Sequence, residues 1–338
     1  MSELKTTSLS HKDNNTGTPN ITMYPDGTTS LPGTVLGGFR NQIINSTLSV
    51  FQRSANAGGT GYRSADRWRL GGTAPNLQIV YPNISGLPAG SAGRLTAQAG
   101  GGTITQAIEL HVSGRAAPFL PGTEWTLSFY TTHPSLVASD ISVRFADASN
   151  STANITEFTQ GTLTSIESFS SGWVRYAVTY TAPSGVAGSN KCVNVRLSGL
   201  SDGSAVDFTG IQFEPGPVAT PLEIRPISVE LSMAQRYFFT VRGDIFTKFG
   251  SIFTNNGGGS WMMVSLPVSM RTSPDVTFNN IATGRSGTNL SQDDIETINF
   301  GGTHISLDLD SSYAIPADSS DIVQLRETIG TFNLDAEL

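Results

Sequence analysis

The chain has 338 residues, of which only 14% are charged, and its formal net charge is −7. A weakly charged, acidic chain without a Lys/Arg cluster does not favour nucleic acid or an anionic membrane as partner, because phosphate binding requires a concentrated basic face. The single cysteine, Cys192, excludes an internal disulfide and a multi-thiolate metal site, and we expect it to be a small core residue. The first residues carry no signal-peptide pattern and no apolar run reaches the roughly 20 residues of a membrane span, so we expect synthesis in a cytosol and no membrane insertion.

At this length, two folded units plus an extension are the expected organisation. Residues 1–40 are polar and are predicted to form an extended N-terminal arm, with one turn signal at Tyr24-Pro-Asp-Gly between two short apolar segments. A single hairpin of this size is not stable alone. We therefore expect the arm to dock on another surface or to be mobile.

Residues 41–226 are predicted to form an antiparallel β-sandwich, with a jelly roll as the leading choice. Apolar and polar residues alternate with a period of two, and no segment with helical periodicity lies between the alternating ones. Gly210 interrupts the last alternation and predicts a β-bulge. The clearest strands are residues 108–112, 125–129, 141–145, 173–180, 193–197 and 206–213, with weaker ones near 77–79 and 95.

After four prolines between positions 215 and 226, residues 227–239 are predicted to form a short linking helix of about three turns. Ser228 is in the position of a helix N-cap. The apolar stripe of this helix is formed by Ile227, Leu231, Ala234 and Phe238.

Alternation returns in residues 240–338 and predicts a second, smaller β domain. Its strands are expected near residues 261–266, 276–278, 305–309 and 329–334, and the Asn- and Gly-rich run at 255–259 is expected to be a hairpin tip. The fold class is therefore all-β, with an arm, a jelly roll, a linking helix and a C-terminal β domain.

Several motifs at the expected joints resemble those of carbohydrate-binding-module-like jelly rolls in bacteriophage tail fibre and tail-tip proteins. Such domains begin with an Asn-rich first strand, as in residues 41–53, and their last strand continues into a proline-rich connector and a short helix. The resemblance covers residues 41–278. The motifs are Gln52-Arg53, Asp66-Arg67-Trp68, Ile211-Gln-Phe-Glu-Pro-Gly216, Ala219-Thr-Pro-Leu-Glu223, Gln235-Arg-Tyr237 and Leu266-Pro-Val-Ser-Met-Arg-Thr-Ser-Pro274.

This resemblance implies a virion protein made in the bacterial host cytoplasm and displayed on the phage particle. It implies a homotrimer whose residues 1–40 attach to phage tail or capsid proteins and which takes part in adsorption by recognising a host cell-surface glycan. A head fibre, decoration or connector protein without a receptor is the alternative. A polysaccharide depolymerase is a second, lesser alternative.

Exposed aromatic rings are the best candidates for glycan binding, because sugar rings stack on aromatic faces. The candidates beside Gly, Pro or Ser are Tyr62, Tyr81, Trp261 and Tyr313. Packing in the core or between subunits is the competing interpretation of these four residues. Trp125 and Trp173 begin alternating strands and are expected in the core, and Trp68 is expected to be structural, with Arg67 or Arg69 bonding Asp66.

No cofactor is expected. Related jelly rolls often hold a structural Ca²⁺ beside an Asp-Asp pair in the last strand, whereas this chain offers only Asp207 there. Because Ca²⁺ needs six to eight oxygen ligands, a surface carboxylate is the preferred interpretation of Asp207. The four histidines, His11, His111, His133 and His304, show no metal-binding spacing.

An enzyme is not expected either. The sequence contains no nucleophile-elbow or Walker pattern. Two acidic segments contain the paired carboxylates that glycoside cleavage requires. They are Asp293-Asp-Ile-Glu296 and Asp308-Leu-Asp310. The first is typical of an acidic turn and the second of the polar face of a strand.

Overall fold

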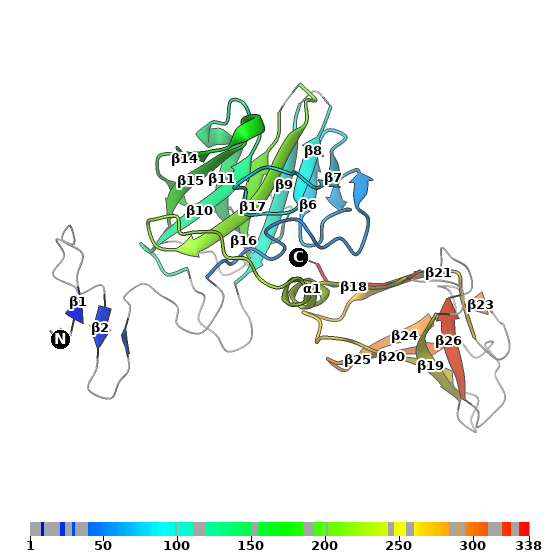
Figure 1. Cartoon of the computed structure of the whole chain (residues 1–338). Coiled ribbons are helices and arrows are strands. Elements are labelled where there is room, and N and C mark those ends of the chain that lie inside the picture. Colours follow the sequence, from blue (N-terminus) through cyan, green and yellow to red (C-terminus); the bar gives the residue numbers. More distant parts are fainter. Residues whose placement is uncertain are drawn as a thin grey trace, which may run out of the picture.

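In the computed structural model, almost all of the described regular elements are antiparallel strands (Figure 1). The structure describes the backbone of residues 8–9, 21–23 and 29–30, and residues 40–98, 100–110, 119–149, 155–184, 192–200, 202–242, 247–254, 260–283, 289–290, 295–309, 320–325 and 331–337. The all-β fold class predicted from the alternation is confirmed.

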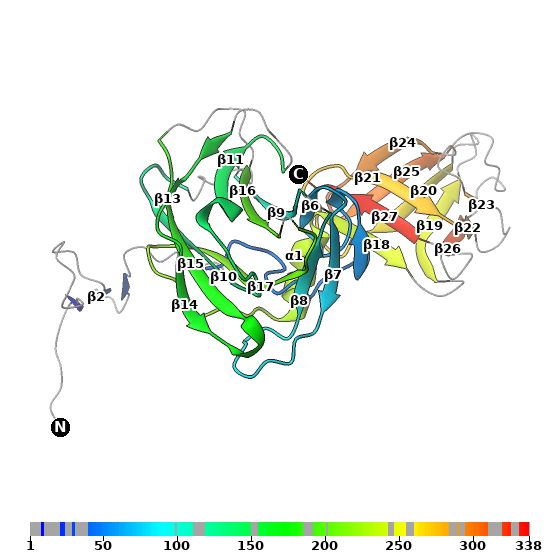
Figure 2. The same cartoon turned by 90° about the horizontal axis from the view of Figure 1, so that it is seen from above.

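Two sheets form the jelly roll and face each other around its core (Figure 2). Sheet I has the strand order β13-β15-β10-β17-β8-β7-β4, with β14 also paired to β15, and sheet II has the order β12-β11-β16-β9-β6-β5. The strands of sheet I are β4 Asn56–Gly58, β7 Asn76–Val80, β8 Ala92–Thr96, β10 Glu124–Thr131, β13 Thr159–Gln160, β14 Thr164–Ser168, β15 Val174–Thr181 and β17 Val206–Pro215. Those of sheet II are β5 Gly61–Tyr62, β6 Arg69–Gly72, β9 Gly102–Glu109, β11 Ile141–Ala146, β12 Thr156–Glu157 and β16 Cys192–Ser198.

The strand order by itself defines a jelly roll. Strands β8, β9, β10 and β11 alternate between the sheets, as do β15, β16 and β17, and the last strand, β17, pairs with β8 and β10. This connectivity buries one apolar face of each sheet against the other. The largest side chains in the core include Trp68, Trp125, Phe129, Phe145, Tyr180, Phe208 and Phe213.

The predicted bulge at Gly210 is confirmed. The pairing of β10 with β17 shifts register between Ser128 and Tyr130, and Gly210 has φ +55°. A Cβ atom at this position would lie 2.7 Å from the Tyr130 ring. The bulge therefore requires glycine both for its backbone conformation and for the space beside Tyr130.

The predicted first strand at residues 41–53 is wrong, because that segment follows bends and turns. The Asn45 side chain explains the difference: its Oδ1 accepts hydrogen bonds from the backbone N–H of Ser49 and Val50, at 2.8 and 2.9 Å. Asn45 itself has φ +56°. Asparagine side chains that bond the local backbone compete with strand pairing.

The linking helix, α1 Ile227–Gln235, ends four residues before the predicted boundary at 239. The Ser228 cap is wrong: Pro226 is the N-cap and makes no side-chain capping bond. Phe238, which was assigned to the helix, begins strand β18 Phe238–Arg242. The strand forms because residues 238–242 pair along their whole length with β27 Thr331–Asp335.

The predicted apolar stripe of α1 is also only partly correct. Ala234 is fully buried, but Ile227 is 58% exposed. Glu230 is buried instead, because its carboxylate pairs with Arg225 at 2.9 Å and accepts the Asn45 backbone N–H at 2.6 Å. A charged contact to the jelly roll thus replaces part of the apolar contact that the spacing predicted.

The C-terminal β unit consists of two sheets around a second core. Sheet III has the order β18-β27-β21, and sheet IV the order β23-β22-β26-β19-β20-β25-β24. The core includes Ile252, Met262, Val264, Leu307 and Phe332. The remaining strands are β19 Lys248–Thr254, β20 Ser260–Ser265, β21 Asp275–Asn279, β22 Ile281–Thr283, β23 Asn289–Leu290, β24 Ile295–Phe300, β25 His304–Leu309 and β26 Ser320–Leu325.

The arm contains the predicted hairpin. Strand β2 Ile21–Met23 pairs with β3 Thr29–Ser30 and also with β1 Ser8–Leu9. The turn of this hairpin and the rest of the arm lie outside the described residues. The hairpin tip predicted at 255–259 in the C-terminal unit also lies outside them, between the paired strands β19 and β20. Two 3₁₀ turns, Ala138–Asp140 and Ser170–Gly172, complete the described elements.

Candidate functional site

The motifs that carry the family resemblance converge where the jelly roll meets the C-terminal unit. The Arg53 guanidinium lies 3.6 Å from the centroid of the Phe238 ring, and that of Arg67 lies 3.5 Å from the centroid of Tyr237. The Gln52 side-chain amide donates to the Phe238 carbonyl at 2.7 Å. Cation–π and hydrogen-bonding contacts of this kind hold the two units together, so these residues build a joint.

Asp66 is the central carboxylate of this joint. It accepts hydrogen bonds from the backbone N–H and the side-chain amide of Gln52, at 3.1 and 2.8 Å. The prediction that Arg67 or Arg69 bonds Asp66 is therefore wrong. Burial raises the pKa of the Asp66 carboxyl to about 6, although the Gln52 hydrogen bonds and the nearby Arg53 charge oppose the shift.

Two arginines of the joint pair with carboxylates of the C-terminal unit. Arg67 pairs with Glu337, and the two side chains are 1% and 5% exposed. Arg53 pairs with Asp335 at 3.0 Å, and the Asp335 side chain is 42% exposed. The Arg67–Glu337 pair is thus desolvated, whereas the Arg53–Asp335 pair is in contact with solvent.

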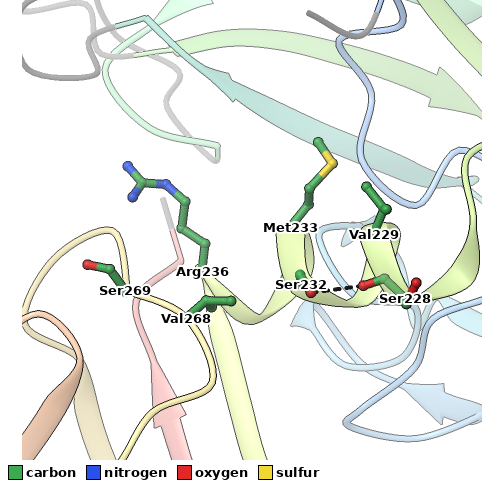
Figure 3. Close-up of a pocket in the computed structure, with 7 residues that line it drawn as sticks. All are labelled: Ser228, Val229, Ser232, Met233, Arg236, Val268 and Ser269. Atoms are coloured by element: carbon green, nitrogen blue, oxygen red, sulfur yellow. Dashed lines mark hydrogen bonds between the residues drawn. The ribbon is translucent and has the colours of Figure 1, made fainter.

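A hollow of about 450 Å³ lies beside α1 at this joint (Figure 3). It is lined by Ser228, Val229, Ser232 and Met233 from α1, by Arg236 directly after α1, and by Val268 and Ser269 from the loop opposite. The Arg236 guanidinium is engaged with Glu109 at 3.3 Å. Its lining has no aromatic ring, and the Ser232 hydroxyl already donates to the Ser228 carbonyl at 2.8 Å. Ligand pockets are mostly lined by apolar and aromatic side chains around a few polar groups, so we interpret the hollow as a crevice between packed elements.

The outer face of sheet I is covered in part by the protein's own connector. The Gln212 amide donates to Glu214 at 2.7 Å, and Glu214 in turn accepts the Thr220 backbone N–H at 2.9 Å. Arg40 pairs with Glu214 at 2.8 Å, and Arg175 donates to the Thr220 carbonyl. The connector therefore covers the part of this face around Gln212 and Glu214. A hollow of about 300 Å³ remains beside it, lined by β10, β14, β15 and the connector residues Pro217, Val218 and Ala219.

An apolar cluster covers a further part of the outer face of sheet I. Tyr130 and Trp173 are buried on the outer face of sheet I, and Leu87, Phe169 and Leu222 pack against them. Trp173 is thus buried as predicted, but in this outer cluster rather than between the sheets.

The outer face of sheet IV is different, because it presents aromatic rings. Phe253 on β19 and Trp261 on β20 are cross-strand partners. Their rings are stacked, with centroids 6.2 Å apart and planes at 28°. Phe253 is 37% exposed and the neighbouring Met263 is 39% exposed, whereas Met262 and Val264 alternate with Trp261 and Met263 and lie in the core. Alternation on β20 therefore places Trp261 and Met263 on the surface.

Polar groups flank the aromatic pair. Asp308 on β25 is the cross-strand partner of Trp261 on the side opposite Phe253. Its Oδ2 accepts a hydrogen bond from the Asn299 side-chain amide at 3.1 Å, which orients the carboxylate. We call Phe253, Trp261, Met263, Asp308 and Asn299 the aromatic row.

The aromatic row combines two chemical features. Ring faces accept the C–H surface of a sugar, and a carboxylate accepts hydrogen bonds from sugar hydroxyls. A hollow of about 460 Å³ adjoins the row and is lined by Phe249, Gly250, Ser251, Phe253 and Met263, together with Lys248 and Ser265.

The four predicted glycan-binding residues lie in different places. Trp261 is in the aromatic row. Tyr81 follows β7 on the jelly roll and is 69% exposed, as expected. Tyr62 belongs to the joint: its ring centroid lies 5.6 Å from the Arg53 guanidinium, and burial raises the pKa of its hydroxyl to about 12. Tyr313 lies outside the described residues.

Phe253 and Met263 were not among the predicted site residues. The Lys-Phe-Gly-Ser sequence at 248–251 obscures alternation, and the pairing of β19 with β26 shifts register between Lys248 and Gly250. The available signal was the alternation of β20, which puts Trp261 and Met263 on the face opposite Met262 and Val264. Phe253 could be added only through strand pairing.

Asp207 is not a metal ligand in this arrangement. Arg94 donates to both of its carboxylate oxygens, at 2.8 and 2.9 Å, so a guanidinium occupies the position that Ca²⁺ would need. The described part of the chain contains no group of three or more His, Cys, Asp or Glu side chains placed to hold a metal ion. The weak Ca²⁺ candidate is therefore corrected to an ion-pair residue.

Of the acidic groups considered for catalysis, Asp293 and Asp310 lie outside the described residues. Asp308 is a member of the aromatic row. Cys192 is fully buried, and burial raises the pKa of its thiol to about 12, which removes it as a nucleophile and confirms it as a core residue. Among the described helices, none has the length and apolar character that crossing a membrane requires.

Neither the family models nor the curated proteins match this chain. Solved structures similar to it include the enzymatically active domain of bacteriophage CBA120 tailspike protein 4, with 13% identity over 52% of this chain and a TM-score of 0.33. The match spans only 22% of that tailspike chain. A cyclase from Fischerella sp. TAU matches with 13% identity over 52% of this chain and 96% of its own, with a TM-score of 0.32. The module TmCBM61, solved with β-1,4-galactotriose, matches with 15% identity over 53% of this chain and 100% of its own, with a TM-score of 0.27.

Proposed function

We propose that this protein is a non-enzymatic virion component of a tailed bacteriophage, a tail fibre subunit that attaches to the particle through residues 1–40 and takes part in recognition of a host-surface glycan. The low charge, the all-β fold and the motif resemblance support the virion role. The observation that carries the glycan part is the aromatic row on sheet IV, where stacked rings, a bonded carboxylate and an amide meet on a solvent-facing surface.

The aromatic row is a better glycan site than the outer face of sheet I. The latter is covered in part by the Glu214–Thr220 contacts and by the cluster around Tyr130 and Trp173, and the hollow of about 300 Å³ that remains on it has no aromatic ring in its lining. In this proposal the jelly roll and its joint position the C-terminal unit, and the C-terminal unit contacts the host.

A shallow aromatic surface binds one sugar segment weakly. We expect the protein to compensate through several copies, since linked sites raise avidity by about 10² to 10⁴ without new contacts. A homotrimer would present three aromatic rows to a repeating surface polysaccharide.

Adsorption provides the test. Purified protein should bind host cells and reduce adsorption of the phage, and Trp261→Ala should lose most of this binding while remaining folded. Tyr81→Ala is the matched control, because it removes an exposed aromatic ring from the jelly roll instead. Loss with Tyr81→Ala but not with Trp261→Ala would contradict the site, and absence of cell binding by the wild-type protein would contradict receptor recognition.

A head fibre, decoration or connector protein is the second candidate, and the joint favours it. The residues that resemble the phage family hold two units together through cation–π contacts and an ion pair. For such a protein, Trp261→Ala would leave adsorption unchanged and joint variants would impair particle assembly.

A further inference from the structure

The aromatic row contains one charged side chain, the carboxylate of Asp308. On β25, Asp308 alternates with the core residues Leu307 and Leu309, so it points to the outer face of sheet IV, where it is half-buried. It is the cross-strand partner of Trp261, which is in turn the partner of Phe253. The two rings and the carboxylate therefore lie in line on three neighbouring strands, about 5 Å apart from one strand to the next.

This carboxylate has no cationic partner in the described part of the chain. The Asn299 side-chain amide donates to its Oδ2 at 3.1 Å, and no other described group bonds it. The hollow beside the row contains a lysine, Lys248. Lys248 precedes Phe253 by five positions on β19, about 15 Å along the strand. That distance exceeds the Debye length of about 8 Å at physiological ionic strength, so Lys248 does not neutralise Asp308.

The surrounding sequence adds negative charge. Residues 286–325 include strands β23 to β26 of sheet IV and contain seven acidic residues and no lysine or arginine. Charge of one sign attracts ligands of the opposite sign, most strongly at low ionic strength. These acidic residues do not define a site by themselves, but their field favours a cationic ligand at the aromatic row. They are Asp293, Asp294, Glu296, Asp308, Asp310, Asp318 and Asp321.

Both chemical parts of the row favour positive charge. The face of an aromatic ring attracts an ammonium group within about 6 Å of its centre, and tryptophan does so most strongly. A carboxylate accepts charge-assisted hydrogen bonds from ammonium, and these are roughly twice as strong as bonds from a neutral hydroxyl. A sugar that stacks on Trp261 and carries an ammonium group gains from both, whereas a neutral sugar gains only the stacking and a weaker hydrogen bond.

We infer that the aromatic row prefers a glycan that carries ammonium groups, as an unacetylated amino sugar does. The inference rests on the proposed function, in which the row binds a host-surface glycan, and adds the charge of that ligand. Phe253 and Trp261 bind the ring faces of the sugar. Asp308, oriented by Asn299, selects the ammonium group and is the specificity-determining residue.

Three trisaccharides with the same β-1,4 backbone test the inference by calorimetric titration. The glucosamine trimer carries an ammonium group on each ring at slightly acidic pH, whereas cellotriose carries a hydroxyl and the N-acetylglucosamine trimer a neutral acetamide at the same carbon. At low ionic strength, the glucosamine trimer should bind about fivefold more tightly than either neutral trimer. Equal binding of the three, tighter binding of a neutral trimer, or no binding of any of them would overturn the inference.

Variants of Asp308 identify the residue that selects the charge. Asp308→Asn should weaken binding of the glucosamine trimer about fivefold and change binding of cellotriose less than about twofold. Asp308→Glu should keep part of the preference, because the negative charge remains. Asp275→Asn is the matched control, since Asp275 is an exposed aspartate on sheet III of the same unit. An equal loss in Asp308→Asn and Asp275→Asn would show a bulk charge effect and overturn the role of Asp308.

Two further measurements separate recognition of a cationic sugar from other effects. A lower Tm of Asp308→Asn, together with equally weakened binding of all three trimers, would show that Asp308 is structural and overturn its selective role. Trilysine supplies ammonium groups without a sugar. If trilysine bound as tightly as the glucosamine trimer, and if Trp261→Ala weakened both alike, the ligand would be a cationic peptide and the assignment to a glycan would be wrong.

The inference and the proposed function fail separately. If Trp261→Ala reduces adsorption to host cells but the wild-type protein binds the three trimers equally, the row binds a glycan without selecting its charge, and only the inference fails. If Trp261→Ala adsorbs normally but loses the glucosamine trimer, and Asp308→Asn loses the preference, the ammonium site stands and its role in adsorption does not.

Discussion

The substitution Glu337→Gln tests the joint between the jelly roll and the C-terminal unit. It removes the charge that pairs with Arg67, whose side chain is 1% exposed, and that also lies 3.5 Å from the Arg53 guanidinium. The arginine would retain its contact with the Tyr237 ring, 3.5 Å from the centroid, but its charge would lie buried without a counter-ion. Breaking a buried pair in this way costs about 3 to 5 kcal/mol. Because glutamine keeps the shape and one acceptor, we expect the lower end of that range.

Urea unfolding followed by tryptophan fluorescence measures this cost. Asp335→Asn is the matched control: it breaks the Arg53 pair, but the Asp335 side chain is 42% exposed, so the loss should stay below about 1 kcal/mol. Replacing both Arg67 and Glu337 by apolar residues should restore part of the stability, as expected for coupled partners. A loss for Glu337→Gln no larger than that for Asp335→Asn would refute the view that the Arg67–Glu337 pair is a buried structural contact.

Three further predictions follow from single residues. Burial raises the pKa of the Asp66 carboxyl from 3.8 to about 6, so between these pH values the folded state keeps a proton that the unfolded state releases, and the stability from this group is lost as pH rises from about 4 to 6. In urea titrations over that range, the unfolding free energy of the wild type should therefore fall by about 2 kcal/mol relative to that of Asp66→Asn. A difference that does not change with pH would contradict the pKa shift. Gly210→Ala should lower the free energy of unfolding by about 3 kcal/mol, through backbone strain and overlap with the Tyr130 ring. In thermal unfolding, its loss of Tm should be larger than that of Gly122→Ala, because Gly122 also has a positive φ, +77°, but has open space around it. Cys192 should react with a maleimide only after denaturation, since it is fully buried; rapid labelling of the folded protein would contradict the packing of sheet II.

Strand positions could be predicted because one face of each strand is buried, which forces apolar residues to alternate. The bulge at Gly210 was predictable for a related reason, since glycine in an alternating strand has few other roles. The C-terminal boundary of the helix could not be predicted from the sequence, because residues 238–242 form a strand only through pairing with residues nearly one hundred positions later. The same holds for the burial of Glu230, which depends on Asn45 and Arg225.

The candidate site was predictable only in part. Trp261 could be chosen because it stands beside Ser260. Tyr62 satisfied the same local criterion, beside Gly61, yet its ring is taken up by the joint. Which aromatic residue remains open depends on which parts of the chain cover each sheet, and no local pattern carries that information.

Tryptophan fluorescence tests the claim that the aromatic row contacts a host-surface glycan. Trp68, Trp125 and Trp173 are at most 3% exposed, whereas Trp261 is partly exposed, so a ligand stacked on the row changes the emission of Trp261 selectively. We predict that surface polysaccharide extracted from the bacterial host shifts the emission of the wild-type protein, and that Trp261→Phe abolishes the shift. A shift that persists in Trp261→Phe, or its absence in the wild-type protein, would contradict the claim.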